Sequence, residues 1–132
     1  MILIDSSVLI AAARGHVSLD ALLSRALEEE VAVAAITASE LLHGVFRAGA
    51  PARRSRREAF VERVLAAFPV LPFDLTAARI HARIRASLAA KGVAIGAHDL
   101  LIAATALAHG ASVATHDERG FRKIPGLGLT RL

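Results

Sequence analysis

Three short uncharged runs constrain the fold of this chain more than any other feature. They are ILI at residues 2–4, VAVAAI at 31–36 and ASVAT at 111–115. Each is uncharged and mostly apolar on consecutive residues, which is typical of strands buried on both faces of a parallel sheet. Segments with apolar residues at helical spacing lie between them. This alternation of strand and helix predicts an α/β fold in which helices cover a mostly parallel sheet.

Further elements complete the pattern. We expect two more short strands, in VLPF at 70–73 and near residues 127–131. The periodic segments predict helices over about 7–13, 19–27, 37–48, 60–68, 80–88 and 99–108. No repeat, low-complexity tract or linker interrupts the 132 residues, so we expect one domain over residues 1–132.

Composition narrows the classes of function. The chain has no cysteine, which excludes disulfides, thiolate metal sites and cysteine nucleophiles and suits a reducing compartment. We see neither a signal peptide nor a membrane-spanning run, and therefore expect a cytoplasmic protein. A net charge of +4 favours an anionic partner.

Acidic residues stand where ligands bind in such folds. Asp5 follows the first run, Glu40 lies in TASELLHG after the second, and Asp117 follows the third. Asp99 opens a predicted helix. In parallel sheets, ligands bind beyond the carboxyl ends of the strands. The sequence therefore predicts that these carboxylates gather at one edge of the sheet.

Each acid also has a purely structural interpretation, and taken singly these are the stronger ones. Asp5 could cap a helix, and Glu40 could form a capping box with Thr37. Asp99 could complement a helix dipole, and Asp117 could form an Asx-turn.

Together, the four acids favour a metal site. Four converging carboxylates repel one another unless a cation compensates their charge. Oxygen ligands without cysteine suit Mg²⁺ or Mn²⁺. Carboxylates that hold one or two such ions are the usual apparatus for phosphodiester hydrolysis, because the metal activates water and stabilises the leaving oxygen.

Four segments resemble the PIN domain family, and within it the VapC-type toxins of prokaryotic toxin–antitoxin pairs. They are ILIDSSVLI, ITASELLHGV, GAHDLLIAATALAHGA and VATHDERGFRKIPGLGL, in this order over residues 2–129. The resemblance implies a three-layer α/β/α sandwich and a Mg²⁺- or Mn²⁺-dependent endoribonuclease.

The resemblance also implies roles for single residues. It assigns the acidic site to Asp5, Glu40, Asp99 and Asp117, and supporting hydroxyls to Ser7 and Thr115. It implies a homodimer, a cognate antitoxin that blocks the cleft, and RNA as substrate. One position departs from the family, which often has a polar or acidic residue just before the last phenylalanine, where this chain has Gly120.

Basic residues are candidates for RNA contacts. RRSRR contains Arg53 and Arg54, and Arg79 and Arg83 lie one helical turn apart. Ordinary solvated helix surface explains them equally well. The chain has no Trp or Tyr, and the five Phe are expected in the core, so base stacking on aromatic side chains is poorly supported.

Rival classes fit less well. The D-S-S sequence lacks the acidic pair of a phosphoacceptor receiver and the D-x-D of a dehalogenase-like phosphatase. No P-loop, dinucleotide fingerprint or G-x-S-x-G is present. The alternative that stays open is a degenerate PIN-like module that binds RNA or a partner without cutting.

Overall fold

The computed structural model describes residues 1–132, and its centre is a five-stranded parallel sheet. The strand order is β3-β2-β1-β4-β5. The strands are β1 (Ile2–Ile4), β2 (Val31–Ala34), β3 (Val70–Leu71), β4 (Ser112–Ala114) and β5 (Leu129–Thr130). The first strand is central, so the chain builds the sheet outwards in both directions from β1.

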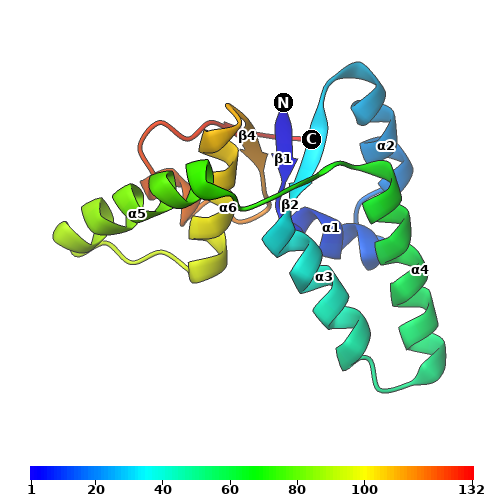
Figure 1. Ribbon diagram of the computed structural model, residues 1–132. Coiled ribbons are helices and arrows are strands. Elements are labelled where there is room, and N and C mark those ends of the chain that lie inside the picture. The colour runs from blue at the N-terminus through cyan, green and yellow to red at the C-terminus, as the bar shows by residue number, and fades with distance from the viewer.

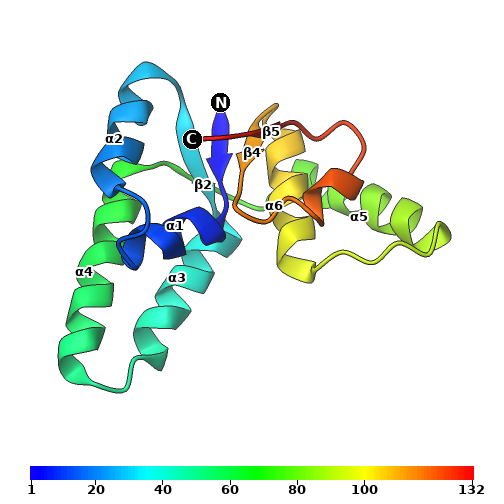
Figure 2. The ribbon, with the colours of Figure 1, turned by 180° about the vertical axis from the view of Figure 1, so that it is seen from behind.

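Helices cover both faces of the sheet. They are α1 (Ser6–Ala13), α2 (Leu19–Glu28), α3 (Ala35–Arg47), α4 (Pro51–Ala67), α5 (Leu75–Ala90) and α6 (Ala97–Ala108), with a 3₁₀ turn at Phe121–Lys123. Figure 1 shows α1, α2 and α4 on one side of the sheet and α5 and α6 on the other, and Figure 2 shows the same division from behind. The predicted three-layer α/β/α sandwich is confirmed.

Two buried clusters hold the layers together, and alternate residues of each strand divide between them. Ile2 and Ile4 of β1 pack under α1, α2 and α4, whereas Leu3 between them packs under α5 and α6. In β2, Val31 and Val33 face the first cluster and Ala32 faces the second. Burial on both faces is the physical reason that these strands carry no polar residue.

Strand register brings the first candidate residues together. Ile4 is paired with Val33 of β2 on one side and with Ala114 of β4 on the other. The residues that follow, Asp5 and Thr115, therefore leave the sheet side by side although 110 positions separate them. The Asp5 amide donates to the Ala114 carbonyl at 2.9 Å, which fixes this exit.

Several boundaries differ from the sequence predictions. The second run is a strand only to Ala34, because α3 begins at Ala35 rather than Thr37. Thr37 thus lies inside the helix, where its hydroxyl is buried without a hydrogen bond, and the predicted Thr37–Glu40 capping box is wrong. Helix α4 begins at Pro51, well before the predicted residue 60, because proline suits a first helical turn.

The phenylalanines only partly follow expectation. Phe68 and Phe121 are buried in the two clusters, whereas Phe46 is 75% exposed. No helix is both long enough and apolar enough to cross a membrane.

Candidate active site

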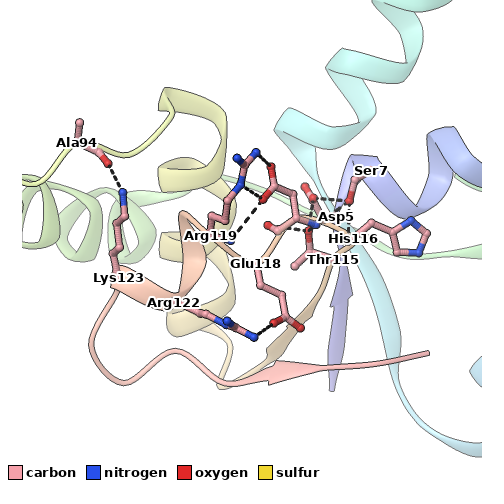
Figure 3. Close-up of polar contacts among 10 residues, drawn as sticks. Asp5, Ser7, Ala94, Thr115, His116, Glu118, Arg119, Arg122 and Lys123 are labelled. Atoms are coloured by element: carbon pink, nitrogen blue, oxygen red, sulfur yellow. Dashed lines mark hydrogen bonds and ion pairs between the residues drawn. The ribbon is translucent and has the colours of Figure 1, made fainter.

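Asp5 is the most firmly held of the candidate acids. It occupies the position before α1, but its carboxylate caps no backbone amide. It is 4% exposed and accepts hydrogen bonds at Oδ2 from Ser7 Oγ (2.8 Å) and Thr115 Oγ1 (2.7 Å). Figure 3 shows these three side chains pointing toward one another. Hydroxyl donors orient a buried carboxylate and offset the cost of its burial.

The turn after β4 places Asp117 beside this group. Thr115 Oγ1 accepts from the Asp117 amide at 3.0 Å, so one hydroxyl links both acids. Asp117 Oδ1 accepts from the Arg119 amide at 3.3 Å, which confirms the predicted Asx-turn. The Arg119 guanidinium also donates to both Asp117 oxygens at 3.0 Å, and these hydrogen bonds hold the pKa of Asp117 below its usual range.

Asp99 lies in the first turn of α6, as predicted. Two glycines stand against its carboxylate. A Cβ at Gly96 would lie 3.9 Å from Asp99 Oδ2, and a Cβ at Gly120 only 3.0 Å from it. Any side chain at position 120 would therefore displace Asp99, which gives the departure at Gly120 a physical consequence.

Glu40 reaches the same region from the second turn of α3. Its Oε1 atom lies 3.0 Å from Nδ1 of His98, the residue before Asp99. This approach is not aligned as a hydrogen bond, so Oε1 remains a buried acceptor without a partner. A buried oxygen in this condition is unusual in proteins and is compatible with a cation that supplies the missing interaction.

The electrostatics show that the acids are close enough to act on one another. Burial, followed by the charges of Asp5, Asp117 and Glu40, raises the pKa of Asp99, and the neighbouring His98 opposes this shift. The side chains do not yet form a set of metal ligands, since no three acidic or histidine groups converge closely enough. Asp117 pairs with Arg119 instead, and Glu40 lies against His98.

Residues 2–127 match the PIN domain family. The chain belongs to the PIN domain family. One relative is "Ribonuclease VapC1" of Rickettsia felis, 37% identical over 126 residues, which cover 96% of this chain and 92% of the relative. Another is "tRNA(fMet)-specific endonuclease VapC" of Salmonella typhimurium, 37% identical over 97 residues, or 74% of this chain and 71% of the relative.

Solved structures agree with this PIN domain assignment. The chain superposes on a VapBC2 crystal structure from Rickettsia felis, bound to a DNA fragment from the promoter, with a TM-score of 0.89. That match has 25% identity and covers 100% of this chain and 99% of the other. A VapBC-5 structure from Mycobacterium tuberculosis matches with a TM-score of 0.77 and 32% identity, over 98% and 97% of the two chains.

The basic residues of this PIN domain have different surroundings. Arg53 lines a cavity of about 380 Å³ between α1, α3 and α4 that Glu40 also lines. Arg54 donates to the carbonyls of Phe46 and Ala48, so it braces the α3–α4 turn. Arg79 and Arg83 are exposed on α5, without an ion pair, and line neither the cavity of Asp117 nor that of Glu40.

Sequence reasoning did not foresee two contacts of the site. One is the pair of hydrogen bonds from the Arg119 guanidinium to Asp117, which the D-x-R spacing within a turn could have suggested. The other is the approach of His98 to Glu40. Because α3 and α6 lie far apart in the sequence, no local sequence pattern predicts that contact.

Proposed function

We propose that this chain is a metal-dependent endoribonuclease that hydrolyses RNA phosphodiester bonds and acts as the toxin of a toxin–antitoxin pair. Membership of the PIN family and relatives named as ribonucleases support this proposal. The observation that carries it is the gathering of acids at the carboxyl edge of the sheet, where Ser7 and Thr115 hold the buried carboxylate of Asp5. Burial, followed by the charges of Asp5, Asp117 and Glu40, raises the pKa of Asp99 at the same edge.

The proposed cofactor is Mg²⁺ or Mn²⁺, with one or two ions per site. Asp5, Glu40 and Asp99 would hold the first ion, and Asp117 would serve a second or adjust the charge of the site. Their oxygen chemistry suits hard divalent cations, and the unpartnered Glu40 oxygen offers a free ligand. Such an ion, when bound, supplies Lewis-acid stabilisation and makes water a better nucleophile near neutral pH.

The chain itself supplies orientation. Ser7 and Thr115 donate to one oxygen of Asp5 and so hold that carboxylate in a fixed rotamer. Because Gly120 has no side chain, it leaves room for the Asp99 carboxylate. Preorganised groups of this kind avoid reorganisation during the reaction, which is where much of an enzyme's rate enhancement arises.

The arginines are the candidate residues for contacts with the RNA substrate. We propose that Arg53, which lines the same cavity as Glu40, contacts RNA phosphates, and that Arg79 and Arg83 are weaker candidates on α5. Arg54 would contribute mainly by holding the α3–α4 turn.

We also propose that residues 1–132 form one PIN-like domain that assembles as a cytoplasmic homodimer and binds a cognate antitoxin. Several structural neighbours are toxin–antitoxin complexes, which supports the antitoxin. Exposed apolar side chains, among them Phe46, Phe73 and Leu75, suit protein interfaces. Light scattering across a wide concentration range tests the dimer, and a strict monomer contradicts it.

Cleavage of labelled RNA tests the activity. We expect cutting with Mg²⁺ or Mn²⁺, none with EDTA, and none by Asp5→Asn. Asp20→Asn is the matched control, because Asp20 is an exposed carboxylate on α2. Equal cleavage by the parent and Asp5→Asn, with both folded, contradicts the proposal.

A binding measurement separates a missing substrate from a missing site. Mn²⁺ at one hundred times its dissociation constant should stabilise the parent by about 2.7 kcal/mol and leave Asp5→Asn unchanged. Metal stabilisation without cleavage of any RNA would favour the alternative, a degenerate PIN-like module that binds RNA or a partner.

A further inference from the structure

A cavity of about 570 Å³ borders the acidic cluster on the side away from α3. Its walls are α1, the segment after α1, the ends of β4 and β5, and the turn that carries Asp117. Figure 2 shows β5 beside β4 at the edge of the sheet, with the C-terminus and α1 on the same side of the sheet. The cavity is large enough for one nucleotide, since small-molecule sites occupy about 300–1,000 Å³.

Strand chemistry explains why no helix fills this space. On this side of the sheet, β1 and β2 present Ile and Val, which α1, α2 and α4 cover. Ala114 of β4 belongs to the first buried cluster and also lines the cavity, as Thr130 of the edge strand β5 does, while Val113 and Leu129 face α5 and α6. Small and polar residues expose little apolar surface, so covering them with a helix would gain little free energy. This corner of the sheet therefore stays open.

The cavity shares a wall with the acidic site. Thr115 and Asp117 line it, and the Thr115 hydroxyl is the group that donates to Asp5 at 2.7 Å. If the acids hold a phosphodiester, the neighbouring nucleotide of the RNA strand therefore lies next to this cavity. In single-stranded RNA, the base beside that phosphate can swing out and enter such a pocket.

The polar groups of the cavity suit the edge and the face of a base. Glu118 and Arg122 form an ion pair on its wall, one helical turn apart. Figure 3 shows this pair on the side of the turn that faces away from Ser7. A carboxylate accepts from base amino groups, and a guanidinium donates to base acceptors or stacks on a base plane. The chain has no Trp or Tyr, so the His116 ring and guanidinium planes are the available stacking surfaces in this cavity.

We propose that this cavity is a base-binding subsite for the nucleotide next to the scissile phosphate, and that Glu118 and Arg122 read its edge. The proposal rests on the proposed ribonuclease function and adds a specificity determinant to it. Arg131 also lines the cavity without an ion pair, and its charge favours the anionic phosphate of that nucleotide.

The test measures base preference with Glu118→Gln, a change that keeps size and removes charge. We sequence the products from a random single-stranded RNA pool cut by the parent, by Glu118→Gln and by Asp20→Asn. Asp20 pairs with Arg63 in an exposed ion pair outside the cavity, and therefore serves as the matched control. The preference at one position beside the cut should fall about tenfold in Glu118→Gln alone, since a good base contact discriminates by tenfold or more.

Kinetics on defined oligonucleotides separate recognition from a general disturbance of the site. For the preferred sequence, Glu118→Gln should raise KM and leave kcat near the parental value. An abasic nucleotide at the preferred position should remove the difference between parent and variant. Unchanged preference at every position, or an equal change in Asp20→Asn, overturns the subsite.

Binding without cleavage distinguishes failure of the proposed subsite from failure of the proposed ribonuclease function. In an Asp5→Asn background, fluorescence anisotropy with a labelled hexanucleotide should show about tenfold weaker binding after Glu118→Gln, and only for the preferred base. RNA that binds equally with and without Glu118 overturns the subsite but not the nuclease. Failure of the parent to bind or cut any RNA overturns both.

Discussion

Replacing Thr115 by valine should reveal how strongly the fold holds Asp5. Valine keeps the branched shape and removes the hydroxyl that donates to Asp5 Oδ2 at 2.7 Å. A hydrogen bond to a charged group contributes about 1.5–3 kcal/mol, and the Asp117 amide also loses its acceptor. We expect a loss of about 2–3 kcal/mol in the free energy of unfolding, a large share of the 5–15 kcal/mol typical of a domain.

A double-mutant cycle with Ser7→Ala tests the physical reason. Ser7 Oγ donates to the same oxygen at 2.8 Å and lies 3.2 Å from Thr115 Oγ1. Either hydroxyl alone can still satisfy that oxygen, but the double variant leaves a buried carboxylate oxygen without a near donor. The double variant should therefore lose more stability than the sum of the single variants, by about 1 kcal/mol or more.

Urea denaturation at neutral pH measures these differences. Thr105→Val is the matched control, because Thr105 is also buried but donates only to the Leu101 carbonyl within α6, at 2.8 Å. Its cost should be about 0.5–1.5 kcal/mol. Strict additivity of Ser7→Ala and Thr115→Val, or a cost for Thr115→Val no larger than for the control, would refute the reasoning.

Three further predictions concern the neighbouring groups. Asp99→Asn should stop cleavage and raise the free energy of unfolding at neutral pH. The pKa of Asp99 is raised in the fold, so its ionisation costs stability as pH rises through that pKa. The gain should vanish in acid, and urea titrations that show no pH dependence of the gain contradict it. Gly120→Ala should change stability by less than about 1 kcal/mol, because the backbone angles of Gly120 lie in the right-handed helical region that alanine adopts. It should slow cleavage at least about tenfold, because the added Cβ would crowd the Asp99 carboxylate. Gly49→Ala, with open space around it, is the control, and a parental rate for Gly120→Ala would count against the contact. Arg119→Gln should raise the pKa of Asp117 toward its ordinary value and shift the acidic limb of the pH–rate profile to higher pH; an unmoved limb would show that Asp117 does not titrate in the reaction.

The sequence by itself determined the layers of the fold. Apolar runs such as ILI cannot be half-exposed, so they had to lie inside a sheet covered on both sides, and the segments between them had to be helices. It also placed Asp5, Glu40 and Asp117 after strands and Asp99 at a helix start, because position relative to an element is a local property. Helix starts were less accurate, as α3 and α4 show, because a helix can begin before its apolar stripe: residues 51–59 of α4 are exposed and start at a proline that suits a first turn.

Only the tertiary structure decided which groups touch. The pairing of β1 with β4 puts Thr115 against Asp5, and the packing of α3 near α6 puts His98 against Glu40. It also decided that the β4–β5 corner stays open beside the acids, which supplies the cavity of Glu118 and Arg122. The reason is physical: periodicity records the neighbours of a residue along the chain, whereas strand order and register set contacts between residues a hundred positions apart.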